Sequence, residues 1–134
     1  MNSLFLRVSS GLIVPIMLLI ALLLVVRGHN SPGGGFVGAL VAVAAISLDV
    51  LARDVKATRF IKSAPIAILL GTLSLITCII LARVNGYPLL TAIWYKTTLW
   101  GYKIKVGTPL LFDFGIFFII FGSISSLIVT LVNE

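Results

Sequence analysis

The search for chemistry in this sequence begins with the ionisable side chains that interrupt apolar runs. Asp113 is the one carboxylate placed within an apolar run and not at its boundary. A desolvated carboxylate in a membrane can hold or pass a proton. Asp113 also lies within two turns of the expected start of its helix, where interfacial water and the helix dipole favour the charged form. Two roles therefore remain open for Asp113, a proton or cation role and structural capping or pairing.

Other reactive side chains are few and isolated. His29 is the only histidine and can titrate near neutral pH, but a single histidine without a second His or Cys nearby is not a metal site. We interpret it as a hydrogen-bonding loop residue. Cys78 is the only cysteine and cannot form an internal disulfide. No metal site and no cofactor are predicted, and without a Ser–His–Asp set the chain is not expected to be an enzyme.

The glycine run at residues 33–35 invites comparison with phosphate-binding loops. It lacks the G-x-G-x-x-G spacing, a following G-K-[ST] and a preceding strand. Nucleotide binding is therefore not predicted. The glycines let the backbone enter a helix tightly, and Asn30 or Ser31 can accept hydrogen bonds from the first free amides.

The chain that carries these residues is too apolar for water to be its main solvent. Of 134 residues, 60% are hydrophobic, and the mean hydropathy is +1.21. The ten Lys and Arg and the four Asp and Glu mostly flank the apolar runs. The net charge of +6 thus indicates attraction to lipid headgroups and orientation of spans, not nucleic-acid binding, which needs basic residues on one hydrated face.

The apolar runs predict an all-α integral membrane protein, a single domain over residues 1–134 with four transmembrane helices. About 20 residues of helix cross ~30 Å of hydrocarbon, and four runs approach that length. Pro15 falls inside the first run, whereas Pro65 is expected at the start of the third, where a missing N–H costs little. The expected spans are approximately residues 5–26, 36–52, 64–82 and 108–132.

Three connections join these spans. Residues 27–35 are rich in helix breakers and predict a sharp turn, and residues 53–62 predict a compact basic loop. The long connection over residues 83–107 contains both tryptophans and all three tyrosines, with an alternating pattern at 102–106 typical of a short strand. Two interpretations of it stay open: an anchor at the headgroup level, and a docking surface for another subunit.

Orientation in the bilayer rests on the distribution of positive residues. Four spans place both termini on one side, and five Lys or Arg fall on each side. The compact cluster at residues 53–62 favours the cytoplasm for that side. We therefore predict cytoplasmic termini.

Small residues recur at helical spacing and predict close helix packing. Such stripes let a neighbouring backbone approach closely. Internal packing and contact with a different protein are both compatible with the pattern. The residues assigned to these seams are Gly38 in the second span, Ala67, Gly71, Ser74 and Cys78 in the third, and Gly115 and Gly122 in the fourth.

Two longer motifs point to a family. Residues 28–38 read GHNSPGGGFVG, similar to a G-H-N-x-P-G-G-G-F-x-G turn, and residues 107–115 read GTPLLFDFG, similar to G-T-P-x-x-F-D-x-G. In sequence, order and separation these motifs resemble the MnhB/MrpB family, the B-type subunits of the multisubunit Na+/H+ antiporter (the Mrp/Mnh complex). The motif positions carried over by this resemblance are Gly28, His29, Asn30, Pro32, Gly33, Gly34, Gly35, Phe36 and Asp113.

The resemblance implies an accessory subunit in a hetero-oligomeric complex of a prokaryotic plasma membrane. Such a complex exchanges Na+ or Li+ for protons, and this subunit would be needed for its assembly and activity. The other subunits of the antiporter are then the expected partners. B-type subunits also occur in membrane-bound hydrogenases and related energy-converting complexes, which is the alternative. Neighbouring genes would separate the two.

Overall fold

The computed structural model describes residues 4–27, 34–53, 58–88 and 93–133, and these contain four long helices. They are α1 (Leu4–Arg27), α2 (Gly34–Arg53), α3 (Thr58–Val84) and α4 (Thr108–Asn133). Each has a stretch that is long and apolar enough to cross a membrane. The prediction of a four-helix integral membrane protein is thus confirmed.

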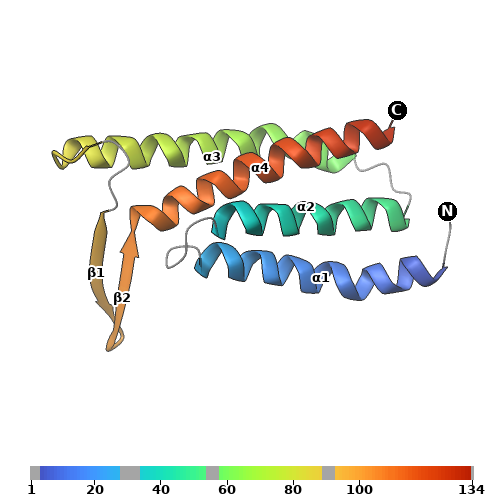
Figure 1. Ribbon diagram of the computed structural model, residues 1–134, viewed down its shortest axis with the longest axis horizontal. Helices are drawn as coiled ribbons and strands as arrows, with labels where there is room; N and C mark the ends of the chain where they lie inside the picture. Colours follow the sequence, from blue (N-terminus) through green and yellow to red (C-terminus); the bar gives the residue numbers. More distant parts are fainter. Residues whose placement is uncertain (1–3, 28–33, 54–57, 89–92, 134) are drawn as a thin grey trace.

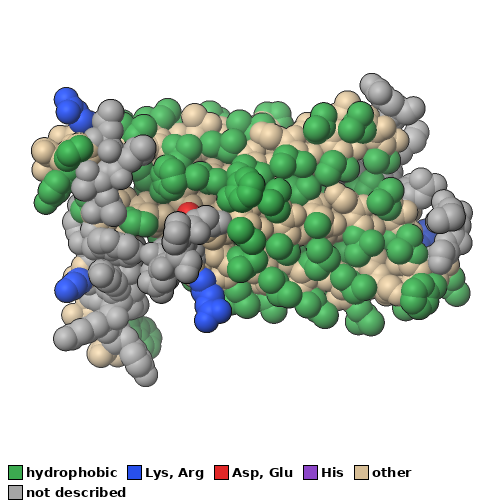
Figure 2. Space-filling view, viewed as in Figure 1, with side chains coloured by type: hydrophobic (Ala, Val, Ile, Leu, Met, Phe, Trp, Pro, Cys, Tyr) green, Lys and Arg blue, Asp and Glu red, His purple; other side chains and the backbone are tan. Residues whose placement is uncertain are grey.

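The helices form an open row in the spatial order α3, α4, α2, α1 (Figure 1). α3 packs on α4, α4 on α2, and α2 on α1, whereas α1 touches α4 only slightly. Half of the apolar window of α2 is buried, against 17–22% of the corresponding windows of the other helices. The outer surfaces of the row are therefore covered with apolar side chains (Figure 2), which only lipid or other apolar protein surfaces can solvate well.

Apolar contact between α2 and α4 forms the small buried core. Ile46 and Val50 of α2 pack with Val129 of α4, and Phe121 covers this cluster. The Phe121 ring stacks on Phe117, with centroids 5.7 Å apart and an interplanar angle of 4°. This aromatic pair lies in the middle of α4.

The start of α1 and the end of α4 lie at the same end of the helix axes. α1 begins, and α4 ends, where α2 ends and α3 begins (Figure 1). At this end Arg53 donates to Asp49 over 2.7 Å, as their i,i+4 spacing suggests. The pair is partly exposed and contributes no more than about 0.5 kcal/mol. The geometry agrees with an even number of crossings.

Two helix starts differ from the expected ones, and α3 differs most. Residues 58–62 belong to α3, so they continue the helix and are not part of a loop, and Pro65 lies inside the helix instead of at its start. An apolar run shows only which residues favour hydrocarbon. Helical hydrogen bonding continues beyond it into the polar layer, and membrane helices tolerate an internal proline.

α2 begins at Gly34, two residues before the expected start. Gly34 and Gly35 are therefore helical, although glycine in a helix costs about 0.5–1 kcal/mol relative to alanine. The close approach of Gly35 to α4, described below, explains why a glycine is needed there.

The long connection between α3 and α4 contains a β-hairpin. Strands β1 (Trp94–Leu99) and β2 (Tyr102–Gly107) pair antiparallel, with Trp94 opposite Gly107 and Leu99 opposite Tyr102. β2 includes the expected strand at 102–106, but its partner β1 was not predicted. The base of the hairpin is tied to α4, because Thr108 N donates to Ile93 O and Ile93 N donates to Thr108 Oγ1, both over 2.9 Å.

The tip of the hairpin is a two-residue turn with unusual chemistry. Trp100 and Gly101 have φ angles of 56° and 79°, the signs of a type I′ turn. Asparagine or glycine is the usual first residue of such a turn. A left-handed backbone costs a residue with a Cβ roughly 1–2 kcal/mol, and Trp100 is 91% exposed. The turn thus holds a large aromatic ring outward at a cost in conformational energy.

Candidate functional site

The structure brings the two sequence motifs into direct contact. Gly35 lies in the first turn of α2, against the backbone of Asp113 in α4. A Cβ added at Gly35 would lie 2.9 Å from the carbonyl carbon of Asp113 and 3.0 Å from its Cα. Real Cβ atoms essentially never approach a backbone this closely. Gly35 is therefore the residue that lets α2 begin directly on α4.

Asp113 occupies a buried position at this crossing. Its residue is 8% exposed, and it lies in the second turn of α4. The first turn of α2 carries backbone N–H groups without intrahelical partners and the positive end of the helix dipole. The site thus combines a buried acidic residue of α4 with the start of a second helix.

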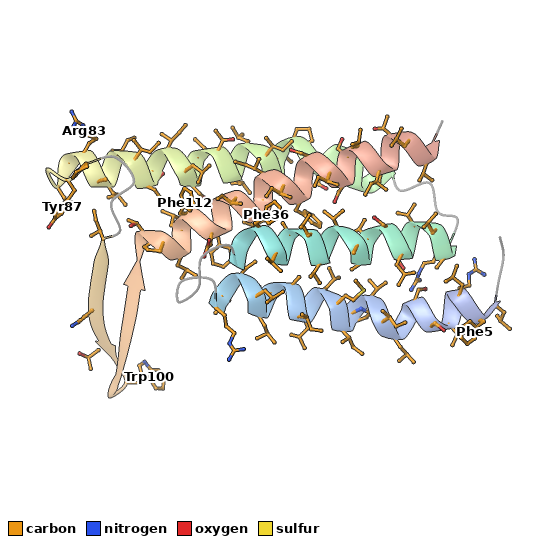
Figure 3. The ribbon with its side chains drawn as sticks, in the orientation of Figure 1. Phe5, Phe36, Arg83, Tyr87, Trp100 and Phe112 are labelled. Atoms are coloured by element: carbon orange, nitrogen blue, oxygen red, sulfur yellow. The ribbon has the colours of Figure 1, made fainter. Side chains whose placement is uncertain are left out.

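Aromatic residues of both motifs lie beside this contact. Phe36 follows Gly35 in α2, and Phe112 precedes Asp113 in α4. Figure 3 places both in the region where the first turns of α2 and α4 meet. Phe36 is half exposed on the outside of the row, and Phe112 is partly buried.

The remaining motif residues cannot be placed in this site. Gly28, His29, Asn30, Pro32 and Gly33 lie outside the described residues. The site as described consists of Gly34, Gly35 and Phe36 from one motif and Asp113 from the other.

The depth of Asp113 follows from the level at which α4 begins. Cys78 Sγ of α3 lies 3.6 Å from Thr108 O, so the start of α4 is level with the last two turns of α3. Asp113 is five residues further along, a rise of roughly 7 Å. It therefore lies inside the apolar stretch of α4, which begins at Thr108.

The small residues of α3 and α4 face each other. A Cβ on Gly71 would lie 2.6 Å from Gly115 O, and one on Gly115 would lie 3.0 Å from Gly71 O. A Cβ on Gly122 would lie 3.0 Å from the carbonyl oxygen of Ala64 and 3.3 Å from the Cβ of Ala67. Cys78 extends the same seam to the start of α4. This seam is the closest backbone crossing between α3 and α4.

Two further seam residues lie elsewhere. Gly38 of α2 faces α1, where its Cβ would lie 2.7 Å from Val25 Cγ2 and 2.8 Å from Ala21 O. Ser74 of α3 donates its hydroxyl to Leu70 O within its own helix, at 3.0 Å. The seam glycines are therefore covered by helices of this chain, and a partner protein has to bind the outer surface of the row instead.

Sequence reasoning named Gly35 and Asp113 as motif positions but missed their contact. Gly35 and Asp113 were assigned to separate places, at the starts of the second and fourth spans. The signal in the sequence was the third glycine of the run, Gly35, because a turn needs no more than two. A glycine retained inside a helix commonly marks a close backbone approach.

Comparison with known proteins covers nearly the whole chain. A family described as a domain related to the MnhB subunit of Na+/H+ antiporter matches residues 5–126. The chain is 33% identical to the B-type subunit of the Na(+)/H(+) antiporter of Bacillus subtilis, over 99% of this chain and 95% of that protein. It is also 33% identical to the putative antiporter subunit mnhB2 of Staphylococcus aureus strain Newman, over 97% of this chain and 94% of that protein.

Proposed function

Because the chain belongs to the MnhB family, we propose that it is an accessory subunit of a multisubunit antiporter that exchanges Na+ or Li+ for protons. Its partners are the other subunits of that complex, in the plasma membrane of a prokaryote. The names of both relatives are those of antiporter subunits, which favours this function over a hydrogenase-type complex. Alignment over almost the full length of both relatives supports a role for the whole chain.

The contact between Gly35 and Asp113 is the observation that carries a role in transport. It joins the two motifs that resemble those of the family, and the Asp113 residue at this contact is buried. A residue that only capped α4 would not need a second helix pressed against its backbone. We therefore assign Asp113 a part in proton or cation movement within the assembled complex.

Replacement of Asp113 by asparagine tests this role. The amide has nearly the same shape but cannot ionise, so the complex should assemble at normal yield. Its exchange of Na+ for H+ should fall by roughly tenfold or more. Transport is measured in vesicles from cells that express the whole complex, and assembly is measured by the yield of copurified subunits.

Asp49→Asn is the matched control, because it also removes one carboxylate but from the partly exposed ion pair at the opposite end of α2. It should leave transport nearly unchanged. Asp113→Glu should restore part of the activity that Asp113→Asn removes. A complex that fails to assemble with Asp113→Asn would instead assign the residue a structural role, and unaltered transport would remove it from the ion path.

Orientation gives a further expected result. The beginning of α1 and the end of α4 lie at one end of the helices (Figure 1), and Arg53 at the end of α2 and Arg59 and Lys62 at the start of α3 belong to that end. A reporter enzyme that works only in the cytoplasm should be active when fused after residue 134. A reporter that works only outside the cell should be inactive there, and the reverse pattern would invert the proposed topology.

A further inference from the structure

The side chain at the tip of the hairpin is almost fully exposed, so whatever contacts it is not part of this chain. Trp100 is 91% exposed and has a left-handed backbone, with φ 56°. Figure 3 shows it at the tip of the hairpin, away from the helices. Asparagine or glycine would fit the turn with less strain. The strain is therefore not compensated by contacts within the chain, and a bulky residue kept in such a backbone is a sign of function.

The level of the hairpin is fixed by the helix contacts. Gly35 at the start of α2 lies against Asp113, and Val25 near the end of α1 lies against Gly38. Both of those helix ends are thus about five residues deeper than Thr108, from which the hairpin projects. That difference is roughly 7 Å, and the headgroup layer is about 5–7 Å thick on each side of the hydrocarbon. The hairpin therefore projects from a level beyond the ends of α1 and α2, while α3 continues past that level to Val84.

The hairpin also reaches sideways. Figure 1 shows it crossing outside the ends of α2 and α1, with its tip beyond the α1 edge of the row. Trp100 is consequently held over the surface next to the protein and not over its own helices. Tyr87, half exposed just after the end of α3, is at the same end of the row (Figure 3). Aromatic rings of both types favour the headgroup layer.

The charge of this end is uniformly positive in the connecting segments. Residues 27–36 and 83–107 contain five Lys or Arg and no Asp or Glu. Arg27, Arg83 and Lys96 are exposed. By contrast, the segments at the opposite end include Asp49, Asp54 and Glu134. The hairpin end therefore matches a negatively charged surface.

We propose that the hairpin tip inserts Trp100 among anionic phospholipid headgroups beside α1, with the surrounding cations contacting lipid phosphates. The exposed cations and the absence of Asp and Glu from these segments favour an anionic lipid surface as the occupant. The hairpin then fixes the depth of α4, and with it Asp113, relative to the membrane surface. This binding is a property of the chain by itself.

Fluorescence in vesicles tests the proposal. The Trp94→Phe variant leaves Trp100 as the only tryptophan, and the full chain is reconstituted in phosphatidylcholine with or without phosphatidylglycerol. A quencher attached near the headgroup should reduce Trp100 fluorescence more than one deep in the acyl chains. Phosphatidylglycerol should increase this quenching, and added salt should reduce that increase. Quenching by aqueous iodide alone, with no response to either lipid quencher, would overturn the proposal.

Two further measurements separate lipid binding from folding and from a protein partner. Trp100→Asn suits the same turn, so the chain should fold normally but retain less phosphatidylglycerol through detergent purification than the Trp94→Phe control. Equal retention by the two variants would contradict the proposal. In the assembled complex, Trp100 should remain accessible to the headgroup quencher. Its protection from both lipid quenchers and iodide only when other subunits are present would identify a protein as the occupant instead.

Discussion

Replacing Gly71 with leucine is expected to separate α3 from α4 and to prevent the chain from accumulating in folded form. Even a single Cβ there would lie 2.6 Å from the backbone oxygen of Gly115 and 2.7 Å from Ile119 Cγ1. Neither a backbone carbonyl nor a packed helix can move aside cheaply. Overpacking typically costs about 1–3 kcal/mol, and a leucine side chain at a backbone crossing should reach or exceed that range. Thermal unfolding of the purified chain in mild detergent measures the loss.

Gly11→Leu is the matched control for this experiment. Gly11 is also a helical glycine in an apolar span, but an added Cβ there meets nothing within 4 Å. The same change of residue should therefore leave the melting temperature close to that of the parent chain. If Gly71→Leu and Gly11→Leu melt together, α3 and α4 do not cross at the distance seen here. A loss of partner subunits by Gly71→Leu would follow from failed folding, because Gly71 already faces α4.

Replacing Gly35 with alanine is expected to abolish most transport while the chain remains in the membrane. The added methyl group would overlap the backbone of Asp113. The first turn of α2 must then move away from α4, at a cost of about 1–3 kcal/mol. This movement changes the field of the helix start at the carboxyl group. Exchange of Na+ for H+ by the assembled complex should fall at least as far as in Asp113→Asn, since both the position and the surroundings of the carboxyl group change.

Gly11→Ala provides the control, because alanine in an open helical position is neutral or slightly stabilising. A Gly35→Ala complex with full transport and normal yield would contradict the importance of the contact. Combining Gly35→Ala with Asp113→Asn gives a further check. If the two residues act as one site, the transport rate of the double variant should be no lower than that of the slower single variant.

The sequence predicted the helices well because hydropathy and helix length measure the same physical requirement. A chain must bury about 20 apolar residues per crossing, and four runs met this condition. Helix ends were less predictable. Residues 58–62 are polar enough to resemble a loop, yet a helix can continue into water at little cost, so α3 begins at Thr58. Hydropathy shows which residues favour the hydrocarbon core, but it does not show at which residue the helical hydrogen bonds end.

The order of the helices could not be predicted for a related reason. Small residues occur on α2, α3 and α4, and each stripe can accept any neighbouring backbone. Gly38 meets α1, whereas Gly71 meets Gly115, and nothing in the spacing distinguishes these outcomes. The contact of Gly35 with Asp113 depends on that order. The sequence therefore pointed to Gly35 and Asp113 as motif positions, but it did not predict the contact between them.

The hairpin shows the limit of local patterns. The alternation at residues 102–106 indicated a strand, and β2 is there. Residues 94–99 read WYKTTL, which does not alternate regularly, so the second strand left no periodic signal. The turn was also hidden, because a tryptophan occupies the position at which asparagine or glycine usually marks a type I′ turn.

The open row has a mechanical consequence. α1 packs closely with α2, and α3 with α4, so the described helices form two pairs that meet mainly between α2 and α4. A rotation of one pair against the other would act across the α2–α4 contact, which also holds the buried core. Gly35 and Asp113 lie at one end of that contact, where the backbones touch. A change in the angle between the two helix pairs would therefore move Asp113 relative to Gly35.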